Sequence, residues 1–175
     1  MADRRDRGSG EDGTADLPDK SGVVAPPPVI AVATLAIAAA LESAWPIGLR
    51  LDVGLGLRLV VAALLAAAGV ALAVAGERRF AKAGTDPLPW RPASALVTTG
   101  IYRFMRNPMY VGLILLMLGI AVGFASLWLL VLLPACALLL HAGVVVREER
   151  YLERKFGDDY RRFVARVPRY GWPRR

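Results

Sequence analysis

The residues whose types and spacing could do chemistry lie in two short polar segments of the chain. The first, TTGIYRFMRNPMYVG, spans residues 98–112 and combines two arginines, two tyrosines and an Asn-Pro pair. Asn107 is a good N-cap and Pro108 suits the first helical position, so we predict that a helix begins there. The free N–H groups and positive dipole of a helix start favour an anion or another polar acceptor. The alternative is ordinary anchoring, because arginine and tyrosine are common at membrane boundaries.

The second polar segment, REERYLERKFG, spans residues 147–157 and follows a long apolar run. Glu148 and Glu149 fall near the predicted C-terminal end of that helix, where acidic side chains oppose the helix dipole. The helix dipole therefore does not explain the two glutamates, whereas a role in a functional site would. His141 lies seven residues before Glu148 on the same helical face, and an ionisable group within a membrane is a candidate functional residue.

The composition indicates a membrane protein. Hydrophobic residues make up 55% of the 175-residue chain and the mean hydropathy is +0.43, which is too apolar for an ordinary soluble domain. The formal charge of +7 is better explained by membrane topology and contact with anionic lipids than by a nucleic-acid partner. Cys136 is the only cysteine and His141 the only histidine, so we predict no disulfide within the chain and no metal site.

Four apolar segments must position the two polar ones. They are residues 29–45, 59–76, 108–123 and 127–146, and the last two share an uncharged run that would extend ~60 Å as one helix, about twice a bilayer core. That run must fold back, and we predict the hinge in GIAVGFASLW, residues 119–128, which contains Gly119 and Gly123, and a kink at Pro134. We predict an all-α polytopic membrane protein with about four transmembrane helices, a C-terminal helical hairpin and a cytoplasmic amphipathic C-terminal helix on the membrane surface.

Charge distribution suggests the domain organisation and the orientation. Residues 1–24 are polar and charge-rich, so we predict a disordered tail, followed by one membrane domain in residues 25–175. Of the 22 basic residues, only two lie between the first two apolar segments, and the hairpin turn has none. By the positive-inside rule both termini are cytoplasmic, and composition suggests a bacterial inner membrane. Residues 77–106 and 147–175 then share one side of the membrane.

The ordered pair of segments resembles a known family. ALVTTGIYRFMRNPMYVG, then a hydrophobic hairpin, then REERYLERKFGDDYRRFVARVPR, is similar to the isoprenylcysteine carboxyl methyltransferases and the related phospholipid methyltransferases, over residues 94–170. The resemblance implies an integral membrane methyltransferase that uses S-adenosylmethionine. The cofactor-binding residues that it implies are Ser94, Ala95, Leu96, Val97, Tyr102, Asn107, Pro108, Met109, Tyr110 and Glu148.

The resemblance leaves the methyl acceptor open. Many eukaryotic members have histidine where Ser94 and Asn107 stand, and a substrate-contacting arginine where Val144 stands. The predicted function is methyl transfer to the carboxylate or thiol of an isoprenylcysteine-like lipophilic substrate. The alternatives are a phospholipid amine N-methyltransferase and a non-catalytic membrane scaffold.

Elementary chemistry suggests roles for the charged residues of this site. Arg103 or Arg106 suits the carboxylate of the cofactor, and Glu148 suits its ammonium group. We take Arg106 and Glu149 as the candidate catalytic residues. An amine acceptor must lose a proton, which Glu149 or His141 could accept.

Overall fold

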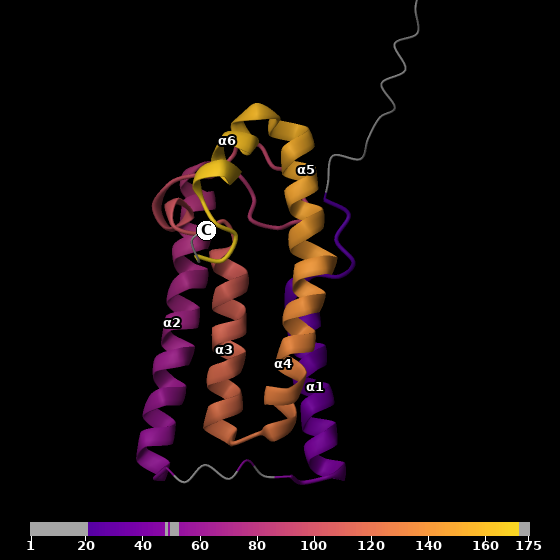
Figure 1. Ribbon diagram of the computed structural model, residues 1–175, viewed down its shortest axis with the longest axis vertical. Helices are drawn as coiled ribbons and strands as arrows, with labels where there is room; N and C mark the ends of the chain where they lie inside the picture. Colours follow the sequence, from indigo (N-terminus) through magenta and orange to yellow (C-terminus); the bar gives the residue numbers. More distant parts are fainter. Residues whose placement is uncertain (1–20, 48, 50–52, 172–175) are drawn as a thin grey trace, which may run out of the picture.

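The structure is a computed structural model that describes residues 21–47, 49 and 53–171, so most of the predicted disordered tail lies outside the described residues. The described residues form helices and no strand (Figure 1). The α-helices are α1 (Pro27–Ala44), α2 (Leu55–Lys82), α3 (Pro108–Phe124), α4 (Leu127–Leu140), α5 (Val146–Phe156) and α6 (Asp158–Arg166). A 3-10 turn, η1 (Gly100–Arg103), precedes α3, and a π-helical turn, η2 (His141–Val145), joins α4 to α5.

Three helices in the described part of the chain are long and apolar enough to cross a membrane. They are α1, α2 and the continuous helix Leu127–Phe156, which comprises α4, η2 and α5. The fourth apolar helix, α3, has 17 residues and is shorter than the others. The prediction of an all-helical membrane protein is therefore confirmed, with the apolar segments in the predicted order.

The chain reverses between α3 and α4 within the predicted hinge segment, so the prediction of two helices joined there is confirmed. Gly119 and Gly123 themselves lie inside α3, and the turn falls at Ala125, whose φ of 50° is left-handed, and at Ser126. The Ser126 side chain caps α4 by accepting a hydrogen bond from the backbone N–H of Leu129 at 3.3 Å. The turn therefore depends on the serine cap of the next helix rather than on the two glycines.

Small residues bring α2 and α3 into backbone contact. A Cβ atom built on Gly112 would lie 2.5 Å from the carbonyl oxygen of Gly69, and one built on Gly119 would lie 2.8 Å from that of Ala62. Such close approach is typical of membrane helices, where association depends on van der Waals packing rather than on the hydrophobic effect. The two helices lie side by side along their length, so α2 fixes the position of the α3 start (Figure 1).

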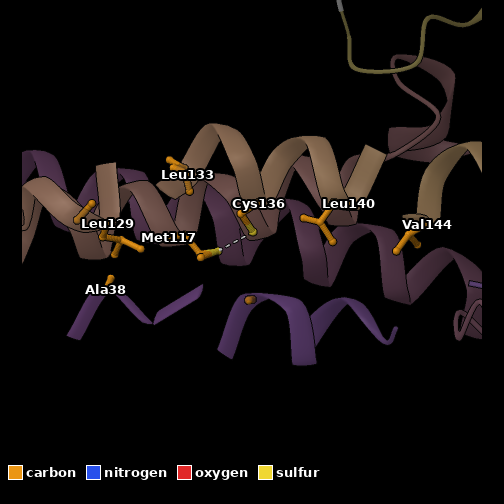
Figure 2. Close-up of a cluster of buried hydrophobic side chains, with 9 residues drawn as sticks. Ala38, Met117, Leu129, Leu133, Cys136, Leu140 and Val144 are labelled. Carbon is orange, nitrogen blue, oxygen red and sulfur yellow. Dashed lines mark hydrogen bonds between the residues drawn. The ribbon is translucent and has the colours of Figure 1, made fainter. Parts of the chain in front are cut away.

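The other half of the bundle packs through larger side chains. Residues from α1, α3 and α4–η2 form a buried apolar cluster that contains Met117, Leu133 and Cys136 (Figure 2). Cys136 is 1% exposed, and its Sγ lies 3.9 Å from the sulfur of Met117. This cluster holds α4 in place below the site.

Two helices extend beyond their predicted bounds into charged sequence. α2 runs from Leu55 to Lys82 rather than over residues 59–76, because Glu77, Arg78 and Arg79 continue the helix after the apolar part ends. The helix that begins at Leu127 likewise continues past residue 146 to Phe156. These extensions carry both helices past the apolar region to the end of the bundle where the polar loops lie (Figure 1).

The C-terminal helix packs on the protein. Gly157, with φ 52° and ψ −123°, separates α5 from α6. Tyr160 and Phe163 of α6 are buried against Val97 and Tyr102 in a second apolar cluster. The C-terminal helix was predicted to lie on the membrane surface through its apolar face, and that prediction was wrong for Tyr160 and Phe163, because these two side chains pack on the loop before α3.

Candidate active site

A pocket lies where the loop before α3, the start of α3, α5 and α6 meet. It brings together all but one of the predicted site residues: Ala95, Leu96, Val97, Tyr102, Arg106, Asn107, Pro108, Met109, Tyr110, Glu148 and Glu149. We call it the main pocket. The two polar segments singled out in the sequence thus form opposite walls of one cavity, although the 34 residues 113–146 separate them in the chain.

Ser94 is the predicted residue that the structure places outside the lining of the main pocket. Its hydroxyl donates a hydrogen bond to the carbonyl of Gly84 at 3.1 Å, and its N–H donates to the Thr85 hydroxyl at 2.9 Å. The neighbouring Ala93 lines the pocket instead, and its N–H donates to the Tyr151 hydroxyl at 3.0 Å. Ser94 therefore holds the shape of the loop.

Sequence reasoning missed part of the pocket wall. The additional lining residues are Phe80, Asp86, Pro87, Leu88, Pro89, Arg91, Ala93, Tyr151, Leu152, Tyr160 and Phe163. The proline-rich stretch that follows Asp86 was visible in the sequence as a loop, but nothing in its composition indicated that it would fold over the pocket. Asp86 shapes this loop, since its carboxylate accepts from the Leu88 N–H at 3.0 Å and pairs with Arg91 at 2.7 Å.

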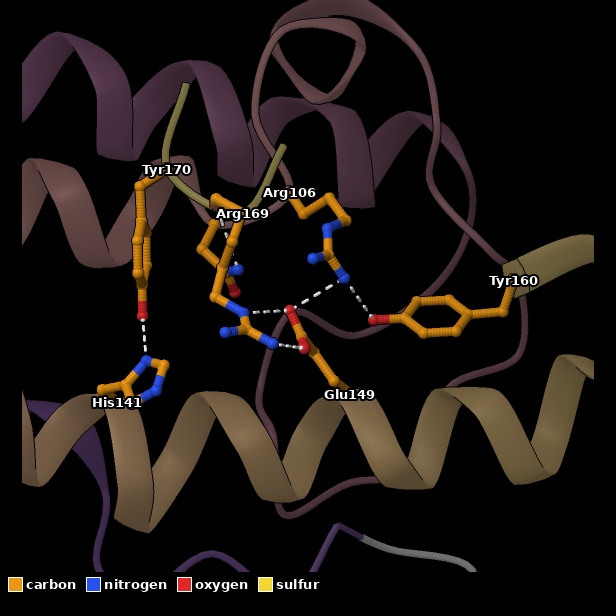
Figure 3. A network of polar contacts seen from close by, with 7 residues as sticks. Arg106, His141, Glu149, Tyr160, Arg169 and Tyr170 are labelled. Carbon is orange, nitrogen blue, oxygen red and sulfur yellow. Dashed lines mark hydrogen bonds and ion pairs between the residues drawn. The ribbon is translucent and has the colours of Figure 1, made fainter. Parts of the chain in front are cut away.

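A network of three charged groups spans the side of the main pocket (Figure 3). Both oxygens of Glu149 bind Arg169, through Nε at 2.9 Å and Nη2 at 2.6 Å. Arg106 Nη1 lies 2.9 Å from the same carboxylate and donates to the Tyr160 hydroxyl at 3.3 Å. The Glu149 carboxylate is thus already engaged by two guanidinium groups.

One edge of the Arg106 guanidinium has no partner. The side chain is only 3% exposed, and its Nε and Nη2 atoms are buried without a hydrogen bond to any described residue. A buried donor left unpaired costs about 1–3 kcal/mol, and more when it is charged. Two adjacent unpaired donors on a residue that lines a pocket indicate a place for an oxygen-bearing anion.

Glu148 and two tyrosines form a second polar group on the pocket wall. The Tyr110 hydroxyl donates to Glu148 Oε2 at 2.8 Å. Tyr102 is 5% exposed and packs edge-on against Phe80, with ring centroids 5.5 Å apart. Burial, and then the charge of Glu148, raises the pKa of the Tyr102 phenol far above its usual range, so the hydroxyl stays neutral. The pocket therefore offers a carboxylate beside neutral aromatic rings.

Tyr160 stays neutral for a similar reason. Burial raises the pKa of its phenol to about 12, and the negative charge of Glu149 adds to this effect, while the neighbouring Arg106 lowers it. A neutral Tyr160 can accept the hydrogen bond from Arg106 and keep its own proton available for another acceptor.

The last described residues close over the start of α3. We call residues 167–171 the C-terminal strap. The carbonyl of Pro168 accepts from the Arg106 N–H at 3.0 Å, and that of Arg169 accepts from the Asn107 N–H at 3.2 Å and side chain at 3.3 Å. The predicted helix start at Asn107 and Pro108 is confirmed, but the Asn107 side chain makes no cap hydrogen bond and binds the strap instead. Tyr170 lies 2.8 Å from His141 Nδ1.

Replacing Arg169 by alanine is expected to release the strap. The change removes both hydrogen bonds to Glu149, which together stabilise the strap by about 1–3 kcal/mol. The amides of Arg106 and Asn107 should then exchange with solvent deuterium faster, which mass spectrometry of the protein in detergent can measure. Arg161→Ala is the matched control, because the described partners of Arg161 are exposed carboxylates of α5 and α6. Equal exchange in both variants would mean that the ion pair does not hold the strap.

Comparison with known proteins agrees with this architecture. The family model described as "Phospholipid methyltransferase" matches residues 57–159, which is more than half of the chain and reaches from α2 to the start of α6. An uncharacterized protein of Haemophilus influenzae is 39% identical over 64 residues, which cover 35% of this chain and 98% of that protein. No solved structure matches the chain. The match over both walls of the pocket and the helices between them shows that this membrane protein belongs to the phospholipid methyltransferase family.

Proposed function

We propose that this protein transfers a methyl group from S-adenosylmethionine to a lipophilic acceptor at the membrane. The observation that carries the proposal is the buried, unpaired edge of Arg106 in a pocket that also contains Glu148. Membership of a methyltransferase family supplies the reaction class, and apolar helices around the site suit a lipid-like acceptor.

The polar groups of the main pocket fit the charged groups of this cofactor. S-adenosylmethionine carries a carboxylate, an ammonium group and a sulfonium. Arg106 Nε and Nη2 can donate side by side to the carboxylate, and Glu148 can accept from the ammonium group. The faces of Tyr102 and Tyr110 can attract the sulfonium. The predicted loop residues Ala95, Leu96 and Val97, with Pro108 and Met109, supply apolar walls.

The chain contributes alignment and the exclusion of water. The bound cofactor supplies an electrophilic methyl group, and no protein nucleophile is required. Placing the acceptor in line with that methyl group can remove several kcal/mol from the barrier. Arg106 can hold the carboxylate of the cofactor only while its own side chain is held in place. Glu149, whose oxygens bind Arg106 and Arg169, therefore acts as a positioning residue. A proton released by an amine acceptor would need a base other than Glu149 in this arrangement.

Two acceptor classes are compatible with this reaction. One is the carboxylate or thiol of an isoprenylcysteine-like molecule, as the resemblance of the polar segments implies. The other is the amine of a phospholipid, with which the description of the matched family model is equally compatible. In both cases the acceptor has a hydrocarbon tail and a polar head that must reach the methyl group.

The arrangement in the membrane follows from the charge pattern. We propose four spans, formed by α1, α2, α3 and the α4–α5 helix, in a bacterial inner membrane with both termini in the cytoplasm. The start of α3 and the end of α5 lie at the same end of the bundle, which supports a pocket at the cytoplasmic face (Figure 1). The basic residues of α6 and the loop before α3 then face the cytoplasm.

Calorimetry with S-adenosylhomocysteine tests this function. We expect the protein in detergent to bind the ligand, and Glu148→Ala to weaken binding by about ten-fold, the equivalent of ~1.4 kcal/mol. Glu153→Ala is the control, because Glu153 lies one and a half turns further along α5 and faces solvent. A wild-type protein that binds no ligand would support the scaffold alternative instead.

A further inference from the structure

The segment that precedes α1 is bonded to the loop that forms one wall of the main pocket. We call residues 21–24 the N-terminal clasp. The Ser21 hydroxyl donates a hydrogen bond to the carbonyl of Pro89, and Ser21 is only 7% exposed. Pro89 lines the main pocket, in the loop that Asp86 shapes. One end of the clasp therefore holds the loop wall of the pocket.

The rest of the clasp is bonded to the helix that carries Glu148. Arg147 Nη1 donates to the carbonyl of Gly22 at 2.9 Å, and the Val24 N–H donates to the carbonyl of Gly143 at 3.0 Å. Gly143 belongs to the π-helical turn η2, and Arg147 is the neighbour of Glu148 in α5. The clasp runs beside this helix (Figure 1). Its second end therefore holds the helix at the level of the pocket.

The clasp is part of the packed structure. A Cβ atom built on Gly143 would lie 3.5 Å from the Val24 side chain, so the clasp lies directly against the helix. Val23 packs against the buried apolar cluster formed by α1, α3 and α4–η2. The clasp can therefore transmit its position from one wall of the pocket to the other.

Two ties thus join the loop to the α4–α5 helix. The second tie is the hydrogen bond from the Ala93 N–H to the Tyr151 hydroxyl at 3.0 Å, one helical turn beyond Arg147. The loop is therefore fastened on both sides of residues 90–92. Since Pro89 and Glu148 both line the main pocket, the clasp helps to set how the loop and the carboxylate lie relative to each other.

The clasp lies outside the residues that the family model matches, which begin at residue 57. Membership of the family therefore does not account for it. Its bonds to two parts of the main pocket give it a role that is particular to this chain.

We infer that the N-terminal clasp positions the loop and Glu148 for binding of S-adenosylmethionine, with Ser21 and Arg147 as positioning residues. This inference rests on the proposed function, because it assigns the main pocket to that cofactor. Neither Ser21 nor Arg147 lines the pocket. Both act through a residue that does, Ser21 through its partner Pro89 and Arg147 through its neighbour Glu148.

Calorimetry with S-adenosylhomocysteine in detergent tests the role of Arg147. Arg147→Met removes the hydrogen bond to the clasp and should weaken binding by about ten-fold. Arg147→Lys should bind nearly as well as the wild type, because an ammonium group can donate to the same carbonyl. Arg154→Met is the matched control, since Arg154 is an exposed residue of the same helix that does not line the pocket, and its affinity should be unchanged.

A double-mutant cycle tests whether the clasp acts as one unit. Ser21→Ala removes the bond to Pro89 and should also weaken the binding of S-adenosylhomocysteine. If both changes release the same segment, the variant that carries both should bind about as weakly as Arg147→Met alone. Hydrogen exchange of residues 85–93 should be faster in each single variant than in Arg154→Met, because the loop has lost one tie.

The outcomes separate this inference from the proposed function. Wild-type affinity in both Ser21→Ala and Arg147→Met would overturn the inference, and so would losses that simply add in the double variant. A loss in Arg147→Met that lysine does not restore would also contradict it. Ser21→Ala changes one hydroxyl outside the helices, so it decides the matter alone if Arg147→Met fails to fold. A wild-type protein that binds no S-adenosylhomocysteine would instead reject the proposed function, while the exchange of the loop would still report whether the clasp holds it.

Discussion

Replacing Arg106 by glutamine is expected to weaken the binding of S-adenosylhomocysteine by at least about 100-fold. The unpaired Nε and Nη2 atoms would donate two charge-assisted hydrogen bonds to the ligand carboxylate, and such bonds contribute about 1.5–3 kcal/mol each. Glutamine is also polar, but it carries no charge and cannot donate two parallel hydrogen bonds to a carboxylate as the guanidinium group does. Calorimetry in detergent measures the change directly.

Two controls make this prediction specific. Arg103→Gln changes the other arginine of the same segment, which is exposed and does not line the main pocket, and should alter the affinity little. An analogue of S-adenosylhomocysteine that lacks the carboxylate should bind the wild-type protein and Arg106→Gln with similar affinity. If Arg106→Gln weakened the analogue as much as the full ligand, Arg106 would support the fold rather than bind the carboxylate.

Replacing Gly112 by alanine is expected to destabilise the bundle more than any single change on its outer surface. The added Cβ would lie 2.5 Å from the carbonyl oxygen of Gly69 and 3.1 Å from the backbone nitrogen of Ala73, and neither atom can move without its helix. The helices must separate, and overpacking of this kind costs about 1–3 kcal/mol or more. Thermal unfolding in detergent should show a lower midpoint, and cofactor binding should weaken because Tyr110 precedes this contact by two residues.

Gly56→Ala is the matched control for that experiment. Gly56 lies near the start of α2, and a Cβ there meets nothing within 4 Å. Alanine in place of glycine favours a helix by roughly 1 kcal/mol, so this variant should unfold at the same or a higher temperature. A Gly112→Ala protein as stable as Gly56→Ala would contradict the close packing of α2 on α3.

The sequence predicted best those features that depend on local chemistry. The start of α3 was predictable because proline suits the first turn of a helix and nothing before Asn107 continues the apolar run. The number and order of the apolar helices followed from hydropathy. The ends of α2 and of the α4–α5 helix did not, because charged residues such as Glu77 and Arg150 continue a helix as readily as they end an apolar segment.

Features that depend on distant partners could not be predicted. The chemistry of their side chains made Glu149 and Arg106 candidates, but the bond of Glu149 to Arg169 joins residues 20 apart in the chain. The π-helical turn at His141 has no sequence signal that separates it from an ordinary helix. Asn107 was predicted as a side-chain cap, and it binds Arg169 instead because the strap supplies a carbonyl at that point. The partner of Glu149 and of Asn107 is in both cases Arg169 of the C-terminal strap.

The C-terminal strap has a consequence for the order in which the site is assembled. Its contacts to the start of α3 come from Pro168 and Arg169, which follow the α3–α4 hairpin in the chain. Because a chain is synthesised from its N-terminus, the hairpin can form before the strap residues are made. The wall of the pocket that the strap holds is therefore the last part of the site to be completed.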